Sequence, residues 1–221
     1  MTDTLADDLT LPEIRLALAP LIAEEAVFDG WSETALIAAA RNAGMDPDVA
    51  RYAFSGGAME MIEAWIAHVD HLMAEELSAE TLAGMKIRER IRTLVWFRLE
   101  QVAGLEEALR RASAIMAMPQ NALRSLQRSW KSADLMWRLA GDTATDYNHY
   151  TKRTLLAGIY AASLAVYVDD TSEEKSDSAA FLDRRIEGVM QFEKVKARFL
   201  KAPDERFSLA RFLGRLRYPA S

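Results

Sequence analysis

Apolar residues recur at steps of three and four through most of the chain, which is the spacing of one face of an α-helix. The clearest run is Leu123, Leu126, Trp130, Ala133 and Trp137. Val, Ile and Thr nowhere alternate with polar residues as they do in a half-buried strand, and Gly and Pro are few. The spacing therefore predicts an all-α protein, and its 221 residues suffice for one large or two small domains.

Start and stop signals divide the first 57 residues into three helices. Pro12 suits the first turn of a helix that runs to about Ala26. Ser32 suits the N-cap of a second helix that stops at Gly44, and Asp46 suits the N-cap of a short third one. This order is similar to the helix-turn-helix head of TetR-type regulators. In those regulators the remaining helices form a ligand-holding, dimerising body. We expect a TetR-like bundle of about nine to ten helices, with a degenerate head at 1–57, such a body at 58–202 and an amphipathic helix at 203–221.

The charge of this head argues against nucleic acid. Residues 1–57 hold three basic residues and ten acidic ones. Proteins bind duplex DNA largely by neutralising phosphates with Lys and Arg, so an acidic head is repelled. We therefore expect the TetR-like fold without DNA binding, because a fold does not carry a function by itself. A ligand-sensing transcriptional regulator of the TetR type is the alternative.

The end of the chain is basic and amphipathic. Residues 184–217 hold ten basic residues against four acidic ones. Within 203–221, an apolar helical face lies beside arginines, which is the pattern of a helix in a membrane interface. The residues expected to dock on the membrane are Arg206, Leu209, Arg211, Phe212, Leu213, Arg215 and Leu216. The alternative is a terminal helix that packs on its own body or on a second subunit.

Catalysis has little support in the sequence. There is no cysteine, no glycine-rich phosphate loop and no Gly-x-Ser-x-Gly elbow. The three histidines are His68, His71 and His149, and none follows a Glu by three residues as a di-iron carboxylate site requires. We expect no catalytic residue, no metal and no cofactor. A metal-dependent hydroxylase, with a two-His, one-carboxylate iron site, is the alternative.

Binding of an apolar ligand has more support. Five Trp and ten Met are many for this length, and the adaptable Met side chain is common at apolar binding surfaces. Helical bundles place ligand sites between facing helices. The residues expected to line a lipid-sized cavity are Trp65, Trp96, Phe97, Met116, Trp130, Trp137, Tyr160 and Leu164. Each of them singly also fits an ordinary core, so the prediction rests on the set.

Residues 141–153 join two strongly periodic stretches. Gly141 suits the left-handed residue that ends a helix, and Thr145 or Asp146 suits the N-cap of the next one. Residues 147–153 then crowd aromatic and basic groups into the start of that helix, which a plain turn does not need. These groups indicate a binding surface, and the alternative is a helix start with solvated side chains.

Several motifs resemble the accessory lipid-binding proteins of ubiquinone (coenzyme Q) biosynthesis over nearly the whole chain. The most specific are Asp-Leu-Met-Trp at 134–137 and Ala-Gly-Asp at 140–142, followed by Asp-Tyr-Asn-His-Tyr-Thr-Lys-Arg at 146–153. Residues 28–32, Phe-Asp-Gly-Trp-Ser, and residues 86–91, which begin Lys-Ile, also resemble the family. So do residues 179–186, although Ala179 stands where an aromatic residue is common, and His149 stands where Trp is common.

The resemblance implies a TetR-like fold without DNA binding, a body that holds lipid, a membrane-docking helix at the end of the chain and a homodimer. It implies that the protein is no enzyme but presents an isoprenoid quinone intermediate to the demethoxyubiquinone hydroxylase. A phospholipid is the other ligand that it implies. The residues implied to face the hydroxylase are Met136, His149, Tyr150, Lys152 and Arg153.

The first ten residues carry three Asp and no basic residue, whereas secretory signals and mitochondrial transit peptides are positively charged. We therefore expect a bacterial protein without a cleavable targeting signal, cytoplasmic and peripheral on the inner face of the membrane.

Overall fold

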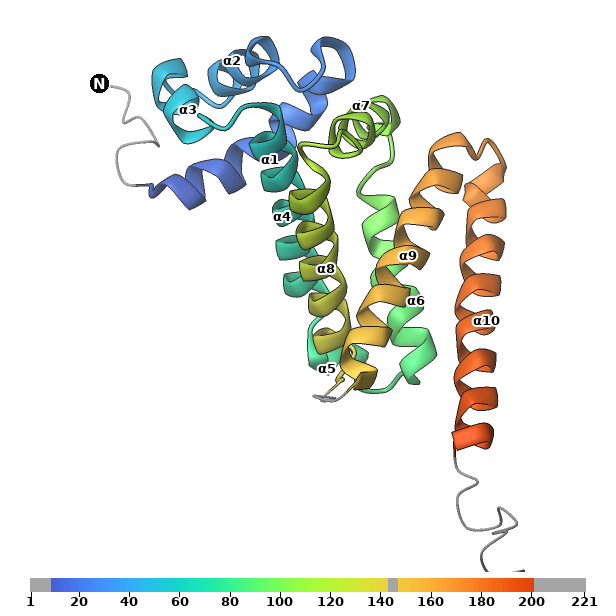
Figure 1. Cartoon of the computed structure of the whole chain (residues 1–221). Helices are drawn as coiled ribbons and strands as arrows, with labels where there is room; N and C mark the ends of the chain where they lie inside the picture. Colours follow the sequence, from blue (N-terminus) through green and yellow to red (C-terminus); the bar gives the residue numbers. More distant parts are fainter. Residues whose placement is uncertain (1–8, 143–146, 201–221) are drawn as a thin grey trace, which may run out of the picture. The chain divides into compact units, whose positions relative to one another are not determined.

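The computed structural model describes residues 9–142 and 147–200, and all regular structure in these ranges is helical (Figure 1). The helices are α1 (Leu11–Asp29), α2 (Glu33–Asn42), α3 (Pro47–Ala53), α4 (Ala58–Glu76), α5 (Ala79–Leu82), α6 (Ile87–Glu100), α7 (Glu106–Met116), α8 (Ala122–Leu139), α9 (Tyr147–Asp169), the 3-10 turn η1 (Glu173–Lys175) and α10 (Ser176–Leu200). The all-α expectation is confirmed. The chain divides into two compact units, residues 1–183 and 184–221.

The first three helices begin where the capping residues predict. Ser32 Oγ accepts a hydrogen bond from the amide of Ala35 at 3.3 Å, and Asp46 Oδ1 accepts one from the amide of Asp48 at 2.8 Å. Both bonds satisfy backbone donors that the first turn of a helix leaves free. Gly44 has a φ of +69°, in the left-handed region that favours glycine. Local sequence therefore determines the shape of the head.

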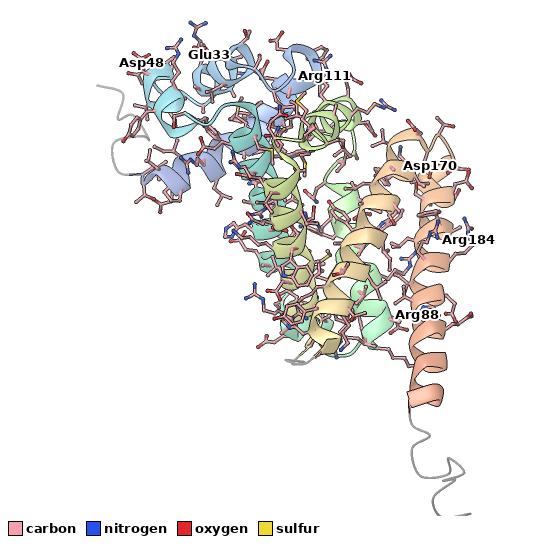
Figure 2. The ribbon with its side chains drawn as sticks, in the orientation of Figure 1. Glu33, Asp48, Arg88, Arg111, Asp170 and Arg184 are labelled. Atoms are coloured by element: carbon pink, nitrogen blue, oxygen red, sulfur yellow. The ribbon has the colours of Figure 1, made fainter. Side chains whose placement is uncertain are left out.

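Trp31 and Arg111 hold the head on the body. The indole nitrogen of Trp31 donates to the carbonyl oxygen of Ala108 in α7 at 2.9 Å, and its ring centroid lies 5.4 Å from that of Trp65 in α4. Arg111 of α7, labelled in Figure 2, donates to the carbonyl oxygen of Phe28 at the end of α1 at 2.9 Å. The Phe-Asp-Gly-Trp segment thus joins two groups of helices.

The body is built around α4, α6, α8 and α9, with α7 beside their upper end in Figure 1. Contacts between α4 and α6, α4 and α8, α6 and α9, and α8 and α9 close this group, and α7 contacts α1, α4, α8 and α9. The apolar face of α4 is buried at Met59, Ile62, Trp65, Val69 and Met73. Burial of such faces supplies most of the helical stability in a bundle.

Some boundaries differ from the expectation. The short helix α5 was not predicted, and α8, which contains the run from Leu123 to Trp137, begins at Ala122. Residues 169–178, which are acidic and rich in Ser, form a structured turn around Asp170, which Figure 2 labels. The carboxylate of Asp170 accepts hydrogen bonds from the amides and hydroxyls of Ser172 and Ser178 at 2.5 to 2.8 Å. Ser178 is fully buried, so this segment is ordered although its polar composition is typical of a loop.

Candidate functional site

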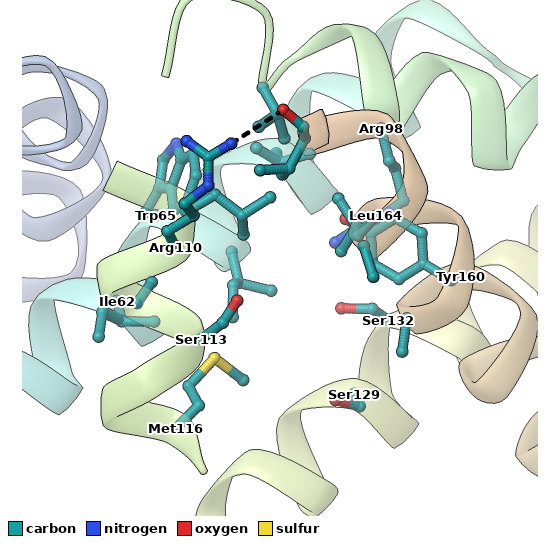
Figure 3. A pocket seen from close by; sticks show the side chains of 18 of the residues that line it. Ile62, Trp65, Arg98, Arg110, Ser113, Met116, Ser129, Ser132, Tyr160 and Leu164 are labelled. Atoms are coloured by element: carbon teal, nitrogen blue, oxygen red, sulfur yellow. Dashed lines mark hydrogen bonds between the residues drawn. The ribbon is translucent and has the colours of Figure 1, made fainter. Parts of the chain in front are cut away.

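A pocket of about 700 Å³ lies in the body (Figure 3). It is bounded by α4, α6, α7, α8 and α9, all of which belong to the first compact unit. Its lining residues are Ile62, Trp65, Ile66, Val69, Arg98, Val102, Leu109, Arg110, Ala112, Ser113, Met116, Ala117, Ser129, Ser132, Ala157, Tyr160, Ala161, Leu164, Ala165, Val168 and Asp169. The volume falls in the range of sites that bury most of a small ligand, and most of the lining is apolar.

Four of the eight residues expected to line a lipid cavity do line this pocket: Trp65, Met116, Tyr160 and Leu164. They come from α4, α7 and α9, so only the folded chain brings them together. In Figure 3, Trp65 and Met116 lie on one side of the pocket, and Tyr160 and Leu164 lie on the other. The remaining four expected residues do not line it.

The four expected residues that do not line the pocket make contacts elsewhere in the fold. Trp96 donates to Glu100 Oε1 at 2.7 Å, and its ring meets Tyr167 edge-on with centroids 6.1 Å apart. Phe97 is buried in the packing of α6. The Trp137 indole donates to the carbonyl oxygen of Lys152 at 3.0 Å. Trp130 lies beside Tyr150, with ring centroids 6.0 Å apart.

One wall of the pocket is polar, which the sequence did not indicate. Arg98 and Ser132 line the pocket and are each 1% exposed. Arg98 donates to Asp70 Oδ1, and Ser132 donates to Asp70 Oδ2 at 2.9 Å. Arg128 also donates to Oδ2 of this carboxylate. The Arg98 guanidinium carbon also lies 4.8 Å from the centroid of the Tyr160 ring. A signal was available in Asp70, since a charge on the apolar face of α4 requires a buried partner.

An ion pair lies at another edge of the pocket. Arg110 of α7 donates to Asp169 Oδ1 at 2.7 Å and to the carbonyl oxygen of Val168 at 3.2 Å, both at the end of α9. Figure 3 shows this contact as a dashed line. The side chains of Arg110 and Asp169 are 49% and 76% exposed, so this edge faces solvent, unlike the wall at Arg98. The pocket therefore has a buried polar wall and a solvated polar edge.

The residues predicted to face a partner separate into two groups. Met136 is fully buried and Arg153 is 2% exposed, so neither is on the surface of the described fold. Arg153 instead donates to Asp134 at 2.5 Å, to Asp142 at 3.2 Å and to the carbonyl oxygen of His149 at 3.1 Å. It thereby ties the end of α8 to the start of α9.

Lys152 belongs to the same tie, because its ammonium lies 2.7 Å from Asp142. Burial acts to raise the pKa of Asp142, but Lys152 and Arg153 outweigh it and hold that pKa below its usual value. The exposed member of the set is Tyr150, at 62%. Leu123 and Leu126 on α8 are also exposed, at 66% and 68%. Trp130 lies beside Tyr150, and Leu126 and Leu123 come four and seven residues before Trp130, on the same face of α8. These four residues are called here the Tyr150 surface.

The membrane-docking residues predicted at 206–216, and the caps predicted at 145 and 146, lie outside the described residues. None of the helices within 9–142 and 147–200 is long and apolar enough to span a bilayer. In the same ranges, no three His, Asp or Glu side chains gather as a metal site would require. His71 forms an ion-pair contact with Glu75 at 3.2 Å, and His68 is half-buried on the same helix.

Comparisons with known proteins agree with the motifs. Residues 122–193 match the model of the COQ9 family. A ubiquinone biosynthesis protein COQ9, mitochondrial, from Rattus norvegicus is 32% identical over 167 residues, which is 73% of this chain and 54% of that protein. The Homo sapiens protein of the same name is 29% identical, over 73% of this chain and 52% of its own length. The chain spans about half the length of these relatives, and its resemblance to this family is confirmed.

The fold also has a solved counterpart. A TetR transcriptional regulator from Nitrosomonas europaea superposes with a TM-score of 0.62 and 20% identity, over 78% of this chain and 95% of that one. This likeness shows the fold alone, and the TetR-like architecture is thereby confirmed.

The expected location was wrong. The relatives from Rattus norvegicus, Homo sapiens and Dictyostelium discoideum are all named as mitochondrial proteins, which overturns a bacterial cytoplasmic assignment. The expectation rested on the charge of the first ten residues. Because the chain spans about half of its relatives, the charge of those residues carries no information about targeting.

Proposed function

We propose that this chain, as a relative of the COQ9 ubiquinone biosynthesis proteins, is an accessory protein of ubiquinone biosynthesis that binds an isoprenoid quinone or a phospholipid in the pocket of its body. The observation that carries the proposal is a pocket of about 700 Å³, mainly apolar, built partly from the α8 and α9 segment that matches the COQ9 model. A cavity of this size shelters part of a lipid rather than all of it.

Such a protein would give a peripheral enzyme access to a lipid that is held in the bilayer. An isoprenoid tail is driven out of water by about 0.8 kcal/mol for each buried CH₂. A bilayer therefore retains the molecule, while a peripheral enzyme must reach its head group. A pocket lined by Trp65, Met116 and Leu164 offers the tail an apolar environment outside the bilayer. The protein thus lowers the cost of presenting the lipid and needs no catalytic residue of its own.

Two surfaces complete the proposed mechanism. Residues 203–221 dock on the membrane, since their arginines favour anionic lipid and their Leu and Phe face enters the interface. The Tyr150 surface receives the demethoxyubiquinone hydroxylase, because it exposes large apolar side chains next to the Arg153 tie that supports it. Exposed aromatic residues are typical anchors of protein interfaces. The protein acts as a homodimer in this proposal.

Ligand binding is tested by filling the pocket. Ala161 of α9 lines it, so Ala161→Trp should displace lipid that purifies with the protein. Ala162, the next residue, does not line the pocket, and Ala162→Trp is the control. Lipid extracts of both variants and the wild type are compared by mass spectrometry, after thermal unfolding confirms that each is folded. Equal isoprenoid or phospholipid content in all three proteins would contradict the proposal.

A DNA-binding regulator remains the second candidate because of the TetR-like fold. Arg51, the basic residue of α3, is already engaged by Glu33 and Asp48 at 2.6 Å each. Its charge is therefore not free for a phosphate, in a head that is acidic throughout. An electrophoretic shift with its own upstream DNA at moderate salt would favour the regulator, and we expect no shift.

A further inference from the structure

A cation lines the pocket at a place where water does not screen its charge from a bound ligand. Arg98 lines the pocket and is 1% exposed, and only ionic partners make burial of a guanidinium tolerable. Figure 3 places Arg98 with Ser132 and Tyr160 on the side of the pocket opposite Trp65 and Ile62. The pocket is therefore apolar on one side and cationic on the other.

The charges around this wall do not balance. Asp70 from α4 is the one carboxylate that Arg98 of α6 and Arg128 of α8 share, and the hydroxyl of Ser132 also donates to it. One anion thus faces two cations. The Arg98 and Arg128 side chains each keep a buried Nε atom without a hydrogen-bond partner. A buried donor without an acceptor is costly, so this network has the capacity for one more acceptor or negative charge.

The other charged residues that line the pocket do not supply this additional negative charge. Arg110 from α7 and Asp169 from α9 pair with each other at 2.7 Å and cancel. The α9 side chain at the polar wall is Tyr160, whose ring covers the Arg98 guanidinium at 4.8 Å. The described residues that line the pocket therefore have a net charge of one positive unit. This charge lies at the buried wall of Arg98 and not at the solvated edge of Arg110 and Asp169.

We propose that the pocket takes an amphiphile with a singly charged acidic head, a carboxylate or an ionised phenol, which lies toward Arg98 while its tail contacts Ile62, Trp65 and Met116. The proposal rests on the lipid-binding function proposed above and specifies the class and direction of the ligand. The acidic group supplies the missing negative charge, and the low dielectric of the wall strengthens its attraction to Arg98.

The wild-type protein tests this with matched ligands. Laurate and methyl laurate share the same chain and differ at the head by the negative charge and one methyl group, and so do 4-octylbenzoate and its methyl ester. Isothermal titration calorimetry below the micelle concentration should show each acid binding about tenfold or more tightly than its ester, as a charge-assisted hydrogen bond predicts. The tighter of the two acids distinguishes a fatty acid from an aromatic acid as the source of the head group.

Two arginine variants locate the head group. Arg98→Gln removes the lining charge but leaves Asp70 paired with Arg128 and Ser132, so no carboxylate is stranded. Arg128→Gln is the matched control. It also removes one positive partner of Asp70, but the Arg128 side chain does not line the pocket. We expect acid and ester to bind equally to Arg98→Gln, and the acid to remain at least about threefold tighter with Arg128→Gln.

Each outcome has a distinct meaning. Equal binding of acid and ester to the wild type overturns the inference but leaves the apolar pocket and the proposed function intact. Absence of binding by all four ligands overturns the inference as well, whereas the lipid content of Ala161→Trp, measured by mass spectrometry, decides the proposed function separately. Equal losses in the two variants overturn the placement of the head at Arg98. If circular dichroism shows that Arg98→Gln is unfolded, Arg98→Lys replaces it, and the wild-type comparison still decides the charge preference.

Discussion

Two arginines, Arg98 and Arg153, are the largest fully buried side chains of the described residues, and they have different roles. Arg98 faces the pocket and carries one of two cations on a single carboxylate. Arg153 faces three acceptors from two helices and the segment between them, and two of these acceptors are carboxylates. The first arrangement places positive charge at the wall of a pocket, whereas the second joins two helices and is structural.

Replacement of Arg153 should therefore affect stability first. Arg153→Gln leaves buried Asp142 with Lys152 alone, and we expect a loss of about 3 kcal/mol in the free energy of unfolding, typical of a broken buried ion pair. Arg138→Gln is the matched control, because Arg138 contacts the same Asp134 at 3.0 Å with its side chain 64% exposed, and should cost less than about 1 kcal/mol. Urea unfolding measures both, and similar losses would contradict the assignment.

Asp170 predicts how stability depends on pH. Hydrogen bonds from Ser172 and Ser178 hold the pKa of Asp170 far below its usual value. A carboxylate with a depressed folded-state pKa contributes stability that is fully present above its unfolded pKa of about 3.9 and is lost as the pH falls below it.

We accordingly expect the unfolding temperature of the wild type to fall more steeply between about pH 4.5 and pH 2.5 than that of Asp170→Asn, which cannot lose this charge. Above pH 5 the variant should be the less stable protein. Differential scanning calorimetry across this range measures the two slopes, with exposed Asp177→Asn as the control that should follow the wild type. If the unfolding temperatures of the wild type and Asp170→Asn fall equally steeply with pH, the turn at residues 169–178 does not depend on this carboxylate.

At the scale of elements, α9 serves both proposed sites. Its middle supplies Tyr160, Ala161 and Leu164 to the pocket, and its first turns supply Tyr150 to the Tyr150 surface. The helix contacts α8, and the Trp137 indole and the Arg153 guanidinium secure the junction between them. One rigid helix thus connects a ligand site with a candidate partner surface.

This arrangement predicts that Tyr150 acts on binding and not on folding. Tyr150→Ala should weaken association with the demethoxyubiquinone hydroxylase by about tenfold or more, since truncation of an interface anchor commonly costs about 2 kcal/mol. Tyr52→Ala is the matched control, because Tyr52 lies in the head and is 71% exposed. Surface plasmon resonance with immobilised hydroxylase gives both affinities. Unchanged binding by Tyr150→Ala would remove this surface from the proposal.

At the scale of the whole molecule, the chain combines an acidic head with a basic end. The head is closed by apolar packing of α1 against α2 and α4. Acidic neighbours engage Arg15, which pairs with Glu60 at 2.7 Å, and Arg51, which pairs with Glu33 and Asp48. Residues 184–217 carry ten basic residues against four acidic ones, and this excess predicts attraction to a negatively charged surface. Attraction of this kind is weakened by salt, because ions screen exposed charges.

Removal of residues 203–221 tests the membrane role directly. The truncated protein should lose flotation with liposomes that contain anionic phospholipid, since each basic residue near such a surface contributes about 1 kcal/mol. Its circular dichroism and thermal unfolding should match those of the full chain. As a second arm, high salt should reduce flotation of the full chain on anionic but not on neutral liposomes. Undiminished flotation after truncation would contradict membrane docking by this segment.

Local sequence determined the helices, their caps at Ser32 and Asp46, the glycine stop at Gly44 and the acidic character of the head, because capping bonds and periodic apolar faces depend on neighbours within a few residues. The tertiary structure alone decided which aromatic residues reach the pocket. Trp65 and Trp96 look alike in sequence, yet one lines the cavity and the other bonds to Glu100. It also decided the cationic wall, since Asp70, Arg98 and Arg128 lie on three helices and meet only when these pack together.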